Sequence, residues 1–75
     1  MSHTVVAELV AAVLQVEVQV GDSVAAEDAV VILESMKMEI PVLAEVAGTV
    51  TEISVAAGDV VNDGDPLVLI TPTSS

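Results

Sequence analysis

The chain has 75 residues and a net charge of −11, from 12 carboxylates and a single lysine or arginine, and it contains neither cysteine nor aromatic residues. This composition excludes disulfides, thiolate nucleophiles and cysteine-ligated metal sites, and the acidic balance argues against nucleic acid or anionic membrane surfaces as partners. Because 53% of the residues are hydrophobic, we expect one folded domain over residues 1–75, with an aliphatic core, rather than an acidic disordered tail.

The start of the chain is polar. We expect residues 1–4 to form a flexible tail, in which His3, the only histidine, is solvated and has no role. These residues lack the basic start of a signal peptide, and no apolar run is long enough to span a bilayer. A cytoplasmic protein is therefore expected, with its first strand beginning near Val5.

The next segment, residues 7–14, is ambiguous, because Ala, Glu and Leu all favour helix and the apolar spacing does not decide. Residues 15–20 then alternate polar and apolar side chains, which is the period of a half-buried strand. The turn signal Gly21-Asp22 ends this alternation. A strand is the better interpretation of this region.

The middle of the chain predicts a tight hairpin with strands at residues 29–35 and 38–43. Two-residue hairpin turns normally place Gly, Asn or Asp where φ is positive, whereas this turn offers Met36 and Lys37. Pro41 has no N–H for a sheet ladder, so it should lie on an edge strand or at a bulge. Beyond the hairpin, Gly48 marks an expected bend.

The second half of the chain repeats the first, since Gly21-Asp22 recurs 37 residues later as Gly58-Asp59. The same offset matches Val13 with Val50, Val24 with Val61, Asp28 with Asp65, Val30 with Leu67, Val31 with Val68, Ile32 with Leu69 and Leu33 with Ile70. A repeat of this length predicts an all-β domain of two similar half-sheets related by a pseudo-twofold axis. Residues 72–75 are expected to form a second flexible tail.

The acidic stretch from Asp59 to Asp65 brings several oxygen atoms together and raises the question of calcium. In an EF-hand frame the third and twelfth positions would be Val61 and Ile70, which cannot bind a cation. We therefore predict turn chemistry and no metal site.

Lys37 is the only side-chain cation apart from histidine, and it lies at the predicted hairpin tip. A catalytic amine needs surroundings that favour its neutral form, whereas Glu34 and Glu39 favour the ammonium. A phosphate site would need a Gly-rich loop that opens a helix. The remaining use is as an exposed acceptor for a covalent group. Met36 and Met38 support this use, because exposed thioethers are typical of surfaces that adapt to partners.

The stretch Glu34-Ser35-Met36-Lys37-Met38 resembles the attachment motif of biotinyl domains, the carrier modules of biotin-dependent carboxylases. The resemblance extends through residues 47–50, residues 55–61 and the repeat. It implies a flattened barrel of two four-stranded antiparallel sheets, biotin joined by an amide to Lys37, and recognition through Met36 and Met38, with Glu34 and Ser35 as motif context. The implied partners are a biotin protein ligase and the biotin carboxylase and carboxyltransferase subunits that use a stand-alone, monomeric carrier. No catalytic residue is implied.

Two alternatives remain open. A lipoyl carrier domain, of the kind that serves 2-oxo acid dehydrogenases, has a similar architecture, but its hairpin usually reads Asp-Lys-Ala, whereas Met36 and Met38 favour biotin. An unmodified β-hairpin interaction domain is the second alternative, and such domains in export adaptors need long flanking helices.

Overall fold

The computed structural model describes residues 2–73, which form eight β-strands and no helix. The strands are β1 (His3–Val6), β2 (Ala11–Val16), β3 (Ser23–Val24), β4 (Ala29–Ser35), β5 (Met38–Leu43), β6 (Gly48–Ile53), β7 (Val60–Val61) and β8 (Pro66–Pro72). Both strands of the predicted hairpin have the expected bounds. None of the described residues forms a helix of the length and apolarity that crossing a membrane would need.

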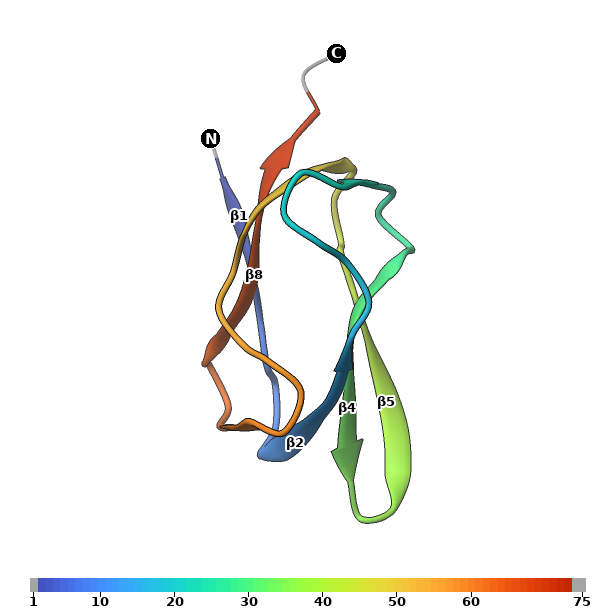
Figure 1. Cartoon of the computed structure of the whole chain (residues 1–75), viewed down its shortest axis with the longest axis vertical. Helices are drawn as coiled ribbons and strands as arrows, with labels where there is room; N and C mark the ends of the chain where they lie inside the picture. Colours follow the sequence, from blue (N-terminus) through green and yellow to red (C-terminus); the bar gives the residue numbers. More distant parts are fainter. Residues whose placement is uncertain (1, 74–75) are drawn as a thin grey trace.

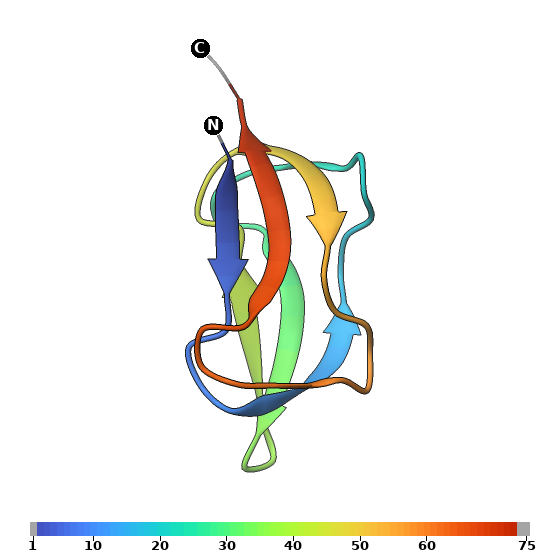
Figure 2. The ribbon, with the colours of Figure 1, turned by 90° about the vertical axis from the view of Figure 1, so that its left-hand side faces the viewer.

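The strands form two four-stranded antiparallel sheets, which lie face to face (Figures 1 and 2). Sheet A has the strand order β1-β8-β6-β3, and sheet B has the order β5-β4-β2-β7. The domain measures 39 × 17 × 17 Å, and the turn between β4 and β5 projects at one end of the long axis (Figure 1). The predicted all-β architecture is confirmed.

The internal repeat is also present in three dimensions. The offset of 37 residues carries β2, β3 and β4 onto β6, β7 and β8 with identical lengths. The short strands are exchanged between the halves, because β3 pairs with β6 in sheet A and β7 pairs with β2 in sheet B. Each half therefore completes the sheet of the other, which explains why one domain needs both copies.

The space between the sheets is filled by aliphatic side chains, as the composition predicts. The buried residues are Val5, Ala7, Ala11, Val13, Val24, Val30, Val31, Leu33, Ala44, Val50, Val61, Leu67, Val68 and Ile70. Along β4 and β8 the same positions of the repeat are buried, and no polar or charged side chain among the described residues is buried. The burial of these side chains is the main favourable contribution to folding.

Gly48 has a different role from the expected bend. It is buried at the start of β6, and an added Cβ would lie 2.2 Å from the Thr71 carbonyl oxygen and 2.8 Å from the Cα of Pro72. A side chain at this position would therefore collide with the backbone of β8, and only glycine permits the close approach of the two strands.

The expectations of flexible tails and of a solvated His3 are wrong for the residues that the structure describes. His3 and Thr4 lie in β1, and Pro72 lies in β8, so these residues belong to sheet A rather than to tails. His3 is also not simply solvated, because its Nε2 lies 2.8 Å from Oε1 of Glu45. The other residues expected in the tails include Met1, Ser74 and Ser75, which lie outside the described residues. Pro41 lies on β5, an edge strand of sheet B, as predicted.

Candidate functional site

The hairpin tip is a two-residue turn with an unusual backbone. Ser35 pairs with Met38, which leaves Met36 and Lys37 as the two central residues of the turn. Their φ values are 54° and 66°, so both lie in the left-handed region. Two positive φ values define a type I′ turn, whose twist matches that of the flanking strands. The register of β4 and β5 therefore imposes a conformation that Gly or Asn would adopt more easily.

The strained turn is held in place by the two strands that flank it. A non-glycine residue in the left-handed region costs about 1 kcal/mol or more, and this turn contains two in succession. The strands that enforce it are anchored, because Leu33 and Val31 on β4 are fully buried in the core. Pairing continues from Ser35 and Met38 along both strands to Ala29 and Leu43, with one irregularity between Ala29 and Val31. The tip is thus held in one geometry by the core.

Every residue of the predicted motif lies at or beside this turn. Met36 and Met38 expose 87% and 60% of their surface, and Lys37 is also exposed. Ser35 is the half-buried last residue of β4. Glu34 is exposed and lies directly opposite Glu39 on β5. The structure therefore brings all five residues together at one end of the molecule (Figure 1).

The surroundings of Lys37 contain little that could perform chemistry on it. Within residues 2–73, His3 and Glu45 form the only contact between a basic side chain and a carboxylate, so the lysine amine is paired with no described carboxylate. The described part of the chain also holds no group of three or more His, Asp or Glu side chains arranged to bind a metal ion. This arrangement presents a primary amine to solvent on a rigid support, and it suits an acceptor on which another protein acts.

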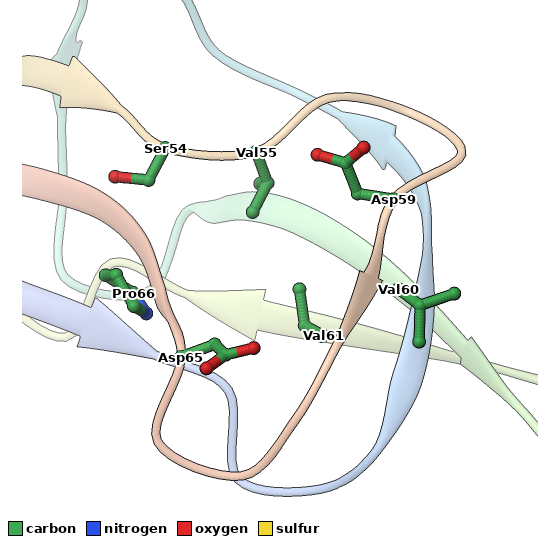
Figure 3. A pocket seen from close by; sticks show the side chains of 7 residues that line it. All are labelled: Ser54, Val55, Asp59, Val60, Val61, Asp65 and Pro66. Carbon is green, nitrogen blue, oxygen red and sulfur yellow. The ribbon is translucent and has the colours of Figure 1, made fainter.

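A hollow of the surface lies in a different part of the chain from the hairpin (Figure 3). It has a volume of about 300 Å³ and is lined by Ser54, Val55, Asp59, Val60, Val61, Asp65 and Pro66. Its two carboxylates are already engaged, since Asp59 accepts the N–H of Ala56 at 2.9 Å and Asp65 accepts the N–H of Asn62 at 2.8 Å. The predicted turn chemistry of the segment from Asp59 to Asp65 is confirmed, and the hairpin contributes nothing to this hollow.

A protein-family model described as "Biotin-requiring enzyme" matches residues 2–70, which include both sheets and the whole hairpin. The chain belongs to the biotin/lipoyl family. The lysine turn is therefore found within a family match that covers nearly the whole chain, rather than in an isolated short motif.

Curated relatives in the biotin/lipoyl family come from mycobacteria. Over 43 residues the chain is 60% identical to Biotinylated protein TB7.3 of Mycobacterium tuberculosis strain H37Rv, and 58% identical to its homologue in Mycobacterium leprae. These matches span 57% of this chain and 61% of each relative.

Solved structures confirm the fold and include both branches of the family. A single-chain, multi-domain long-chain acyl-CoA carboxylase matches with a TM-score of 0.90 and 32% identity, over 99% of this chain and 7% of that chain. The urea carboxylase of Kluyveromyces lactis matches with a TM-score of 0.89 and 34% identity, over 95% and 6% of the two chains. The lipoyl domain of the 2-oxoglutarate dehydrogenase complex from Azotobacter vinelandii matches with a TM-score of 0.73 and 29% identity, over 87% and 82%.

Sequence reasoning missed two features outside the hairpin tip. Glu45 has a φ of 73°, and its side chain contacts His3 across the ends of β1 and β5. Sheet B also presents apolar side chains to solvent, among them Val60, which is 70% exposed, and Leu14, which is 41% exposed. The offset of the repeat was the available signal for this second feature, because it pairs these residues with Ser23 and Thr51.

Proposed function

We propose that this protein is a biotin carrier module, in which biotin is joined by an amide to Nζ of Lys37 and carries a carboxyl group between a carboxylase and a carboxyltransferase. The observation that supports this most strongly is the tip itself. The only side-chain amine of the chain projects from a strained type I′ turn between two exposed methionines. The family match and the biotinylated relatives agree with this assignment.

The tip fits an amide-linked group on chemical grounds. An acceptor amine must be reachable, unpaired and displayed away from the body of the protein, and Lys37 is exposed with no described carboxylate as a partner. The neighbouring side chains of Met36 and Met38 are flexible and polarisable, so they can adapt to the surface of a modifying enzyme. The turn geometry fixes the backbone from which the lysine projects.

Attachment requires an activated acyl donor, which a biotin protein ligase would supply as biotinyl adenylate. The neutral amine of Lys37 attacks the carbonyl carbon of this mixed anhydride and forms the C–N bond. The bond from that carbon to the phosphate oxygen breaks, AMP leaves with the electron pair, and the nitrogen loses a proton to a base of the ligase. The chain contributes the nucleophile and its position.

When bound, biotin supplies a ureido nitrogen that accepts and releases a carboxyl group. The role of the chain is then positional, because Lys37 tethers the group at the end of a 39 Å long domain and the hairpin holds that end rigid. Tethering raises the effective concentration of the group at each partner site and leaves the chemistry to those partners. We propose a biotin carboxylase and a carboxyltransferase as these partners.

Intact-mass spectrometry after coexpression with a biotin protein ligase tests the proposal. We expect one added biotin per chain in the wild type and none in Lys37→Ala. Lys37→Arg serves as the matched control, because it retains the cation and removes the primary amine, and it should also stay unmodified. An unmodified wild type in cells where the ligase biotinylates another carrier would contradict the proposal, as would modification that persists in Lys37→Ala.

A lipoyl carrier is the second candidate, because the Azotobacter vinelandii lipoyl domain is 29% identical and has the same fold. The same measurement separates the two, since amide-linked biotin and amide-linked lipoate add different masses. Coexpression with a lipoate ligase should leave the wild type unmodified. The methionines offer a further comparison, because Met36→Asp with Met38→Ala changes the tip to the Asp-Lys-Ala pattern and should lower biotinylation while permitting lipoylation.

A further inference from the structure

The methionines of the described residues both lie at the hairpin tip. The sequence has three methionines and no cysteine, and residues 2–73 include Met36 and Met38, one on each side of Lys37. Both side chains are exposed. The other large apolar side chains that are exposed in residues 2–73 are valine or leucine, at Val6, Val10, Leu14, Val20, Leu43 and Val60. Within the described part of the chain, sulfur chemistry is therefore confined to the two neighbours of the acceptor amine.

The fold does not require methionine at these two positions. Among the described residues, the side chains that form the core or pack against it include neither Met36 nor Met38. Met36 also has a φ of 54°, which Gly or Asn would adopt more easily. Leucine has a similar volume and would present a similar apolar surface, as it does at Leu14 and Leu43. The property that methionine adds is a flexible thioether, whose sulfur atom can be oxidised.

Oxidation of a thioether by a peroxide is balanced and reversible. The sulfur lone pair attacks one oxygen of hydrogen peroxide, the S–O bond forms, and the O–O bond breaks. The other oxygen leaves as hydroxide, which takes the proton of the transferred oxygen and becomes water, so sulfur loses two electrons and the peroxide gains them. A methionine sulfoxide reductase reverses the change, with a dithiol as the reductant and with water and a disulfide as the other products.

We propose that Met36 and Met38 form a reversible oxidation site, at which conversion to the sulfoxide by a peroxide slows the acylation of Lys37. This role rests on the proposed function, because the acylating enzyme is the biotin protein ligase. A sulfoxide replaces exposed apolar surface on either side of the amine by a polar group, which the ligase would have to desolvate. Because neither side chain packs against the core, oxidation changes the tip and leaves the fold intact.

The exposure of the two sulfur-bearing side chains predicts how fast they react. A peroxide reaches an exposed thioether from solvent without any opening of the structure, so we expect both residues to be oxidised at a rate within about fivefold of that of free methionine. Proteolysis and tandem mass spectrometry of the peroxide-treated chain measure these rates residue by residue. A slower rate at both residues would overturn the oxidation site.

Two variants separate oxidation at the tip from oxidation elsewhere. Met36→Leu/Met38→Leu removes both thioethers from the tip, keeps its apolar character and retains the third methionine of the sequence. The second variant adds Val20→Met to these changes, at a position that is 63% exposed and therefore comparable with the 60% of Met38. Position 20 is outside the tip, since the next residue, Gly21, donates its N–H to Val50 of sheet A.

The unmodified form of each chain is treated with hydrogen peroxide, freed of it and incubated with biotin protein ligase and biotin, and intact mass gives the rate of biotinylation. Each chain is compared with its own untreated sample. We expect oxidation to slow the wild type about tenfold and either variant less than about twofold. Methionine sulfoxide reductase should restore the rate of the wild type. The N-hydroxysuccinimide ester of biotin should acylate oxidised and untreated Lys37 at rates within about twofold, because the amine stays exposed.

Three results would overturn the proposed regulation: equal rates for the oxidised and the untreated wild type, equal slowing in the variant with Val20→Met, or loss of the folded state on oxidation, measured by circular dichroism. The proposed function fails in a different way. An untreated wild type that the ligase leaves unmodified would contradict that function and the regulation with it, whereas the residue-by-residue oxidation rates would still decide whether Met36 and Met38 form an oxidation site.

Discussion

The two halves of the chain share one arrangement of strands, but within the described residues only the first half carries a hairpin after its long strand. In the first half β4 turns directly into β5, and in the second half β8 ends where the corresponding turn would begin, beside the start of β1. The molecule therefore has a lysine hairpin at one end, and the start of β1 and the end of β8 at the other (Figure 1). The shared features build the scaffold, and the hairpin distinguishes the first half from the second.

Sheet A and sheet B also differ in the side chains at matched positions. Sheet A has hydroxyl side chains at Thr4, Ser23, Thr49 and Thr51 and includes the first and last strands. Sheet B has apolar side chains at the equivalent positions, and it also carries the facing pair Glu34 and Glu39 and the strained turn. One difference concerns the scaffold alone: Gly48 begins β6 in sheet A, and Ala11 begins β2 at the equivalent position of sheet B. Substitutions at matched positions can therefore separate scaffold from function.

The largest expected effect is at Gly48. Gly48→Ala places a methyl group 2.2 Å from the Thr71 carbonyl oxygen, and the neighbouring atoms belong mainly to the backbone of β8, which cannot rotate away. We expect the free energy of unfolding to fall by about 3 kcal/mol. Ala11→Gly, the reverse change in sheet B, removes only a small buried methyl group and should cost about 1 kcal/mol. Urea unfolding followed by circular dichroism measures both, and equal costs would show that the two sheets pack alike here.

An intermediate effect is expected at the repeated turns. Asp22 accepts the N–H of Gln19 at 2.9 Å, and Asp59 accepts the N–H of Ala56 at 2.9 Å. Asp22→Ala and Asp59→Ala should each lower the free energy of unfolding by about 1 kcal/mol, since each loses one hydrogen bond. Asp63→Ala removes the same charge from an exposed position and is the control, with a change below about 0.5 kcal/mol. A marked difference between Asp22 and Asp59 would mean that the turns are not equivalent.

The smallest effect should be a gain of stability at the tip. Met36→Gly relieves a non-glycine residue at a φ of 54° and should raise the free energy of unfolding by about 0.5–1 kcal/mol. Thr73→Gly changes the equivalent position beyond β8 and should alter stability by less than about 0.5 kcal/mol. The midpoints of thermal unfolding of the two variants and the wild type are compared. A lower midpoint for Met36→Gly than for the wild type would indicate that the tip carries no strain.

The sequence by itself determined the elements whose signals are local or repeated. The offset of 37 residues and the alternation of polar and apolar residues predicted the all-β class, the paired halves and both hairpin strands. The strand expected over residues 15–20 was wrong in its extent, because β2 ends at Val16. The hairpin tip was predictable because Lys37 is the only lysine or arginine and its neighbours resemble a known motif. These features can be read from the sequence, because strand periodicity and turn chemistry depend on residues that are close in the chain.

Only the tertiary structure decided the features that depend on residues distant in the chain. Only glycine fits at position 48, because the backbone at Thr71 and Pro72 lies too close for a side chain. His3 is held in β1 by pairing with β8 and by its contact with Glu45. Likewise, the exposed side chains of Leu14 and Val60 come to lie on one sheet only once β2 pairs with β7. The reason is that steric contact and surface continuity are properties of the register between strands, and no single stretch of sequence contains that register.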